Sequence, residues 1–230
     1  MDAVLGGGLP RGRVSELCGP LSSGKTSLAL SLLAAATQRG EVVAYVDPAD
    51  ALHPESVGQA GVVLGRLLWV RPRSMLEALR CTELLLRASG FAVIAFDLGM
   101  RPPRSHSGHV WPRLARAAER SHTALVIVAP ERVAGSFAAL SLVFTRKQTG
   151  WSRGPVRLFE ELITDARVVR HKLGGGSFGG TAVALSGQLS AVSFEPGEYE
   201  HEGLQRAEGL GKEPPVNAGG LPSYERVSQG

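Results

Sequence analysis

Residues 13–39 have the sequence RVSELCGPLSSGKTSLALSLLAAATQR, and this stretch decides the fold. Its first part, Arg13–Cys18, alternates and is rich in strand-forming residues, whereas Ser27–Arg39 is apolar along most of its length and is followed by Gly40. The pattern predicts a strand, a loop and a helix in that order. The loop between them, Gly19–Thr26, matches the phosphate-binding pattern G-x-x-x-x-G-K-[ST] in full. The sequence therefore predicts a site for a nucleoside triphosphate, with ATP as the expected ligand.

The residue types of this loop suit phosphate chemistry. Gly19 and Gly24 permit backbone angles that a side chain would forbid, so successive N–H groups can turn toward phosphate oxygens. The helix that follows directs its positive dipole end at the same anion. Lys25 adds a mobile positive charge, and the Thr26 hydroxyl is suited to ligate Mg²⁺. The predicted nucleotide-binding residues are Gly19, Pro20, Leu21, Ser22, Ser23, Gly24, Lys25 and Thr26.

A second candidate for the metal is Asp97, which ends the apolar run FAVIAFD at residues 91–97. A carboxylate at the tip of a buried strand reaches magnesium in many P-loop proteins, often through water. An aspartate in this position is also a common turn initiator. Because a complete phosphate-binding loop precedes it, we expect Thr26 and Asp97 to hold Mg²⁺ together.

The remainder of the chain alternates strands with helices. Strands are predicted at 42–46, 67–70, 91–96 and 124–128, and amphipathic or basic helices at 74–89 and 112–121. This alternation predicts an α/β fold with a mostly parallel, doubly wound sheet and helices on both faces. Shorter strands expected at 140–144, 162–170, 182–185 and 189–194 would extend one edge of the sheet. We predict one domain over 1–194 and a disordered, acidic, Gly/Pro-rich tail over 195–230.

The net charge of +4 is unevenly distributed, with an arginine-rich middle between residues 66 and 173 and an acidic C-terminal stretch. This distribution suits a protein that binds a polyanion, and it equally suits a solvated arginine-rich surface. Trp111 offers a stacking surface among the arginines of the first basic region. The candidate DNA contacts there are Arg101, Arg104, Arg113 and Arg116, and a second basic-aromatic cluster comprises Arg146, Lys147, Trp151 and Arg153.

The two cysteines, Cys18 and Cys81, fit no metal motif and make no disulfide framework. No segment has the run of about 20 apolar residues that a membrane span needs, and the N-terminus lacks the pattern of a signal peptide. We therefore expect a cytoplasmic protein with no membrane contact.

The stretch Met1–Leu28, MDAVLGGGLPRGRVSELCGPLSSGKTSL, strongly resembles the start of the RecA ATPase core. The lead-in LGGGLPRGR, the strand and the loop follow one another in the same order. The likeness covers roughly residues 1–170 and is most specific over the first 55. Within the superfamily, the sequences VDPADAL at 46–52 and LLWVRP at 67–72 are most similar to those of ImuA-type accessory proteins. These proteins are RecA-related partners of damage-induced mutagenic DNA synthesis.

This sequence departs from the RecA pattern at positions that matter for hydrolysis. The resemblance places Ala49 where RecA has the glutamate that activates water, and a methyl group cannot do so. It places Pro130 where RecA has the glutamine that senses the γ-phosphate, and the following loop, 131–139, is shorter than the DNA-binding loop of RecA. The resemblance also implies that an N-terminal filament-forming segment is missing. We expect nucleotide binding to be kept and hydrolysis, phosphate sensing and filament formation to be weakened or lost.

The resemblance implies a RecA-like ATP-binding protein of DNA repair, recombination or the SOS response, acting as an accessory adaptor with weak or no hydrolysis. Its expected partners are a RecA filament, an error-prone polymerase or DNA itself. Two alternatives stay open. The first is an active DNA-dependent ATPase or recombinase in which Asp47 or Asp50 replaces the missing glutamate. The second is a protein whose pocket binds no nucleotide.

Overall fold

A computed structural model of the chain describes residues 9–100, 109–153, 159–172 and 181–185. In these residues eight strands form one sheet in the order β3-β2-β4-β5-β1-β6-β7-β8. The strands are β1 (Val14–Cys18), β2 (Val42–Val46), β3 (Leu67–Val70), β4 (Phe91–Asp97), β5 (Ala124–Ala129), β6 (Ala138–Trp151), β7 (Phe159–His171) and β8 (Thr181–Leu185).

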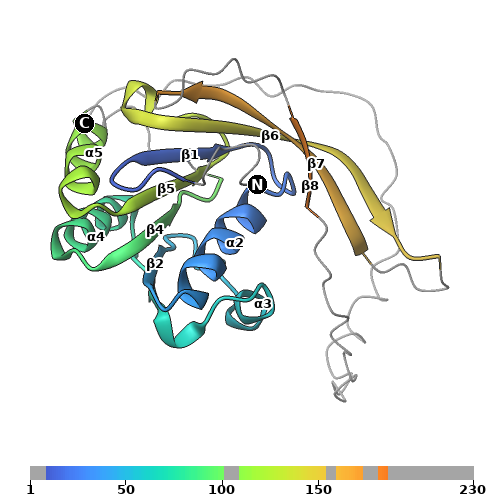
Figure 1. Cartoon of the computed structure of the whole chain (residues 1–230), viewed down its shortest axis with the longest axis horizontal. Coiled ribbons are helices and arrows are strands. Elements are labelled where there is room, and N and C mark those ends of the chain that lie inside the picture. Colours follow the sequence, from blue (N-terminus) through green and yellow to red (C-terminus); the bar gives the residue numbers. More distant parts are fainter. Residues whose placement is uncertain (1–8, 101–108, 154–158, 173–180, 186–230) are drawn as a thin grey trace, which may run out of the picture. The chain divides into compact units, whose positions relative to one another are not determined.

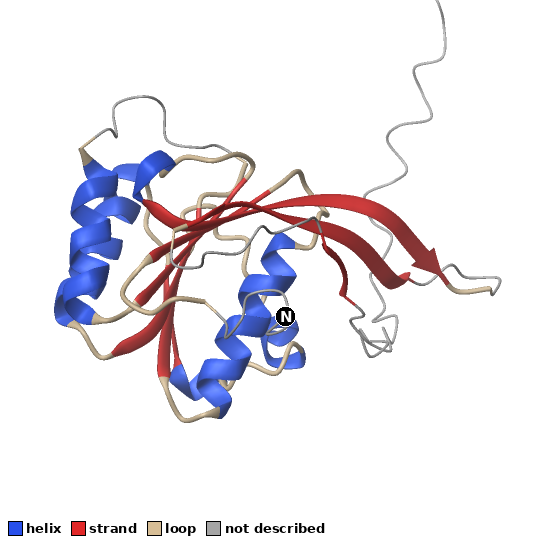
Figure 2. Cartoon of the chain, turned by 45° about the horizontal axis from the view of Figure 1, so that its top comes forward, coloured by secondary structure: helices blue, strands red, loops and turns tan. Residues whose placement is uncertain are grey.

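The first six strands run parallel, and β7 and β8 continue the sheet in antiparallel pairing. The predicted α/β fold with a mostly parallel sheet is thus confirmed. The later strands extend one edge, as expected, but β6 and β7 are longer than the predicted segments at 140–144 and 162–170. The two strands run on beyond the helices in Figures 1 and 2.

Helices cover both faces of the sheet (Figures 1 and 2). On one face lie α2 (Lys25–Gln38) and the short α3 (Pro54–Gln59), whose apolar side chains, such as Leu28 and Val57, pack against the sheet. On the other face lie α4 (Met75–Ala88) and α5 (Val110–Ser121), which bury Leu79 and Leu114. Two 3₁₀ turns, η1 (Leu64–Arg66) and η2 (Gly135–Phe137), precede β3 and β6. Apolar burial on both faces is the main source of stability for such a layered domain.

The helices differ in the side chains that cap their N-termini. Ser74 caps α4 by accepting a hydrogen bond from the Glu77 backbone N–H at 3.2 Å, and Glu77 accepts one from the Arg73 N–H at 2.8 Å. This arrangement resembles a capping box, except that Glu77 reaches the backbone N–H of the residue before the cap. Helix α3, which the apolar pattern does not predict, begins with His53 as its cap and Pro54 in its first turn.

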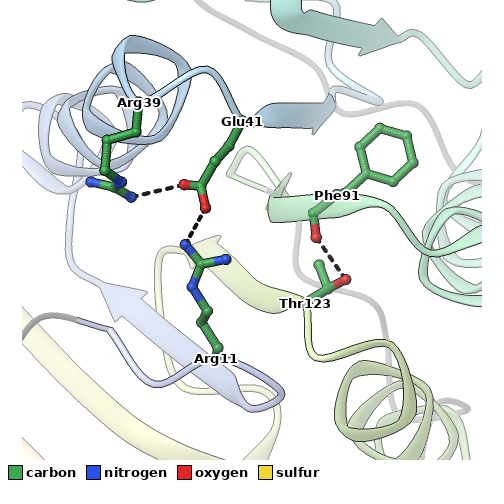
Figure 3. A network of polar contacts seen from close by, with 5 residues as sticks. All are labelled: Arg11, Arg39, Glu41, Phe91 and Thr123. Atoms are coloured by element: carbon green, nitrogen blue, oxygen red, sulfur yellow. Dashed lines mark hydrogen bonds and ion pairs between the residues drawn. The ribbon is translucent and has the colours of Figure 1, made fainter.

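At the N-terminal ends of the strands, a small polar network ties the turn before β1 to the end of α2 (Figure 3). The Glu41 carboxylate accepts hydrogen bonds from the guanidinium groups of Arg11 and Arg39. The bond from Arg11, followed by that from Arg39, holds the pKa of Glu41 below its ordinary value. Nearby, the Thr123 hydroxyl donates to the Phe91 carbonyl oxygen at 2.9 Å and joins the starts of β4 and β5.

The strand predicted at 189–194 and the tail predicted at 195–230 lie outside the described residues, so both stay predictions. None of the helices in the described part of the chain combines the length and apolar character needed to cross a bilayer.

Candidate functional site: a nucleotide-binding cavity

The C-terminal ends of three parallel strands converge on one cavity of about 1900 Å³. The phosphate-binding loop follows β1, the segment 47–53 follows β2, and Asp97 is the last residue of β4. Ligands of open parallel sheets bind at this edge. The described residues that line the cavity include Lys25, Thr26, Tyr45, Ala49, Leu52, His53, Ser56, Arg73, Asp97 and Gly99.

The phosphate-binding loop has the tight backbone that its sequence predicts. Gly24 has φ 86° and caps α2, and Ser22 also has a positive φ of 55°. At Gly19 the demand for glycine is steric, because an added Cβ would lie 2.6 Å from the Phe144 carbonyl oxygen and 2.7 Å from Ser23 Oγ. The loop is therefore folded closely against β6 and has no room for a side chain at its first residue.

Helix α2 differs from α3 and α4 at its N-terminus. No side chain caps α2 and no acidic residue lies in its first turn, which is also true of α5, whereas His53 and Ser74 cap α3 and α4 and Glu55 and Glu77 lie in their first turns. The first N–H groups of a helix need acceptors, and a phosphate supplies them. The uncapped end of α2 therefore fits an anionic ligand.

Lys25 forms part of the cavity wall and is 6% exposed. Its Nζ donates a hydrogen bond to the Pro20 carbonyl oxygen at 2.9 Å. Burial lowers the pKa of Lys25, and the negative charge of Asp97 partly offsets that effect. A phosphate beside Nζ would add favourable charge to a cation that burial alone disfavours.

The Asp97 carboxylate is held by two donors. Its Oδ1 accepts from the Gly99 backbone N–H at 2.8 Å, and its Oδ2 accepts from the Tyr45 hydroxyl at 2.7 Å. Oxygen ligands of this kind, one carboxylate and the Thr26 hydroxyl on the same cavity, fit the coordination preferences of Mg²⁺. The apolar pattern of β2 gives no hint of the role of Tyr45, because only the fold brings it to Asp97.

The segment after β2 presents Ala49 to the cavity, and a Cβ on the facing Gly99 would lie 3.4 Å from the Ala49 methyl carbon. The two neighbouring aspartates are engaged elsewhere. Asp47 is buried and accepts from the Leu52 N–H at 2.9 Å and from the Trp69 indole N–H at 3.3 Å.

The second aspartate, Asp50, accepts both hydrogen bonds of a forked pair with Arg71, each of 2.6 Å. The same guanidinium lies 4.7 Å from the centre of the Trp69 ring. Neither Asp47 nor Asp50 lines the cavity, and Asp97 is the one carboxylate among its described lining residues. These contacts weigh against the alternative in which Asp47 or Asp50 activates water.

Pro130 directly follows β5, and the loop after it is fixed by Glu16 of β1. Glu16 Oε1 accepts from the backbone N–H groups of Val133 and Ala134 at 2.8 and 2.6 Å, and Oε2 accepts from the Ser141 hydroxyl at 2.7 Å. The Glu16 carboxylate is fully buried, with Arg132 Nε 3.8 Å from Oε2. The sequence signal for this contact is Glu16 itself, because a charged residue inside an otherwise apolar strand usually has a buried partner. We call this contact between Glu16 and the loop after β5 the Glu16 clamp.

Strand β7 supports the phosphate-binding loop from the side. The buried Thr164 hydroxyl donates to the Ser23 carbonyl oxygen at 2.7 Å and lies 3.1 Å from the Thr145 carbonyl oxygen of β6. Together with the contact between Gly19 and Phe144, this bond makes β6 and β7 part of the site's framework.

The candidate DNA contacts are only partly described. Arg101 and Arg104 lie outside the described residues. Arg113 and Arg116 are exposed on α5, where Arg113 pairs with Glu83 and Arg116 Nε donates to the Pro112 carbonyl oxygen at 3.2 Å. The stacking role expected of Trp111 is wrong, because its side chain is 5% exposed and packs in the core beneath α5.

The second basic-aromatic cluster lies toward the far end of β6. Arg146, Lys147, Trp151 and Arg153 are all exposed there. Trp151 meets Phe159 edge to face at 5.7 Å between ring centres, and Lys147 lies 3.8 Å from an Asp165 oxygen. The exposed side chains are accessible to a ligand, and what they bind stays a prediction.

Comparison with known proteins agrees with this geometry. Residues 1–101 match the RecA N-terminal domain. Over 98 residues, 42% of this chain, the sequence is 45% identical to Protein RecA of Pseudomonas fluorescens (strain SBW25), Pseudomonas syringae pv. syringae (strain B728a) and Pseudomonas putida. The matched segment spans 28% of the length of those relatives.

The fold has a wider counterpart. The crystal structure of the RadB recombinase superposes with a TM-score of 0.62 and covers 80% of this chain and 92% of its own, at 21% identity. Sequence and fold together therefore support a RecA-like superfamily for this chain, with the sequence likeness carried by its first 101 residues.

Proposed function

We propose that this chain is a RecA-like ATP-binding protein of DNA repair, recombination or damage-induced mutagenesis that holds its nucleotide rather than turning it over rapidly. The observation that carries this proposal is the composition of one cavity wall. Lys25, Thr26 and Asp97, the groups that hold a nucleotide and its metal, line the cavity together with Ala49, which supplies no base.

The binding half of the proposal rests on complementary charge. The uncapped N-terminus of α2, the buried ammonium of Lys25 and the loop amides would hold the phosphates. Thr26 and Asp97 would hold Mg²⁺, which when bound neutralises phosphate charge. The same metal and cradle allow a slow residual hydrolysis.

The accessory role rests on what the cavity wall and the loop after β5 provide. A positioned base contributes about 10²–10⁴-fold to a rate, and Ala49 has none to offer. The loop after β5 is fastened to Glu16, and Pro130 has no amide to contact a γ-phosphate. Partners of an ImuA-like adaptor would be a RecA filament, an error-prone polymerase or DNA.

Equilibrium binding of a fluorescent ATP analogue with Mg²⁺ tests nucleotide binding. We expect saturable micromolar affinity for the wild type and a loss of about 100-fold or more for Lys25→Ala, because a buried cation beside the phosphates is removed. Lys147→Ala, which removes an exposed lysine that does not line the cavity, is the matched control and should bind like the wild type. Absence of binding by the folded wild type would refute the proposal.

Steady-state ATP hydrolysis with and without single-stranded DNA separates the adaptor from the alternative, an active DNA-dependent ATPase or recombinase. The adaptor predicts slow turnover that DNA changes little. Turnover stimulated tenfold or more by DNA and abolished by Lys25→Ala would favour the alternative.

Mixing the protein with a RecA filament, an error-prone polymerase or DNA at two salt concentrations tests the partners. Binding to DNA through phosphates should weaken steeply as salt rises. Arg113→Ala and Arg116→Ala should reduce that salt dependence if α5 meets the backbone of DNA.

A further inference from the structure

Tyr45 is a buried tyrosine of β2, one strand in from the β3 edge of the sheet, and its packing does not require its hydroxyl. It is the penultimate residue of β2 and is 2% exposed. Its ring packs with Leu33 and Val57 in the core between the sheet and α2. A phenylalanine would fill the same space, so the hydroxyl group calls for a separate explanation.

The hydroxyl donates a hydrogen bond to a carboxylate that lines the cavity. Tyr45 Oη donates to Asp97 Oδ2 at 2.7 Å while the Gly99 N–H donates to Oδ1 at 2.8 Å. Two donors, one on each oxygen, fix the rotation of the carboxylate.

Tyr45, Asp97, Lys25 and Thr26 all line the cavity. We infer that Tyr45 is a positioning residue for the divalent cation, whose hydroxyl holds the Asp97 carboxylate in the orientation that binds Mg²⁺ beside Thr26. This inference rests on the proposed function, because it requires that nucleotide and metal bind in this cavity. Groups that hydrogen-bond to metal-binding carboxylates typically influence metal affinity by about 10–100-fold.

The test is a titration of Mg²⁺ at a fixed concentration of a fluorescent ATP analogue, with bound analogue as the readout. Tyr45→Phe should raise the Mg²⁺ concentration at half-maximal binding about tenfold. Affinity for the analogue in EDTA should stay at the wild-type value, because Tyr45 acts through the metal. Trp69→Phe, which removes the indole donor to Asp47 at the same sheet edge, is the control and should leave the Mg²⁺ midpoint unchanged.

A double-mutant cycle locates the effect. Asp97→Asn should raise the Mg²⁺ midpoint, and adding Tyr45→Phe to it should raise the midpoint no further, because the hydroxyl then has no carboxylate to orient. A wild-type or lower midpoint in Tyr45→Phe, an equal effect in both backgrounds, or failure of Tyr45→Phe to fold would overturn the inference. Failure of the wild type to bind the analogue would instead overturn the proposed function.

Discussion

Ala49 and Gly99 face each other at the wall of the cavity, with 3.4 Å between the Ala49 methyl carbon and the place a Gly99 Cβ would take. A longer side chain at residue 49 must therefore extend into the cavity rather than toward β4. The cavity, at about 1900 Å³, has room for it. Position 49 is thus a place where a carboxylate can be introduced so that it faces the cavity.

Ala49→Glu is expected to raise Mg²⁺-dependent ATP turnover about tenfold or more, because the added carboxylate can orient or deprotonate water. Phosphate release at saturating ATP measures it. Ala49→Gln, of similar shape but without a base, should stay near the wild-type rate. Unchanged turnover in an Ala49→Glu protein that still binds nucleotide would contradict the idea that this one residue limits hydrolysis.

Single residues were predictable to different degrees. The loop Gly19–Thr26 and Asp97 follow from local patterns, and the structure brings Lys25, Thr26 and Asp97 to one cavity. Tyr45 was not predictable, because its partner lies 52 residues away and only strand pairing brings the two together. The prediction for Trp111 fails for a local reason, because an aromatic residue among arginines on a helix can face either the core or solvent.

At the scale of elements, the loop between β5 and β6 is the clearest case of a segment fixed by one distant side chain. Glu16 of β1 accepts from two backbone N–H groups of this loop and from Ser141 of β6. Removing an acceptor from buried donors costs about 1–3 kcal/mol for each donor. The loop should therefore open when Glu16 is shortened.

Glu16→Ala is expected to lower the free energy of unfolding by about 2–6 kcal/mol, since two backbone donors lose their acceptor. It should also speed tryptic cleavage after Arg132, which lies in the released loop. Urea denaturation and limited proteolysis measure the two effects. Glu131→Ala, an exposed neighbour, should change neither, and an intact, protected loop in Glu16→Ala would refute the clamp.

Elements with a clear apolar period are predicted well: the bounds of β2 and β3 agree with the structure, and those of α2 and α4 differ by one or two residues at each end. Helix α3 was missed because its six residues, PESVGQ, are too few to display a period. The outer parts of β6 and β7 were missed because exposed residues such as Arg146 and Gln148 replace the apolar pattern there. Backbone hydrogen bonds between β6 and β7 hold these outer parts together although the apolar pattern is absent.

At the scale of the whole molecule, ligand binding is coupled to folding, so the rise in Tm on adding a ligand reports whether the cavity binds it. A ligand that binds only the folded state stabilises it by about 2.7 kcal/mol at 100 times its Kd. For a domain of this size, each kcal/mol raises Tm by roughly 2–4 °C.

Thermal unfolding with and without saturating Mg²⁺-ATP should therefore differ by about 5–10 °C in the wild type. The difference should be much smaller for Lys25→Ala and should fall when EDTA removes the metal. Lys147→Ala again provides the control and should behave as the wild type. An equal rise in Tm for all three proteins would indicate a ligand effect unrelated to the cavity.

The strand order has a consequence for how the chain is synthesised. Strand β1, which carries the phosphate-binding loop, pairs with β5 and β6 and with no strand that precedes them among the described residues. The segment most similar to RecA, residues 1–101, therefore contains the loop but neither neighbour of the strand that holds it. During translation β1 can therefore form no strand pairing of this sheet until β5, which begins at Ala124, has left the ribosome. A fragment that ends near residue 101 would contain the nucleotide-binding motif but neither of the strands that hold β1 and its loop in place.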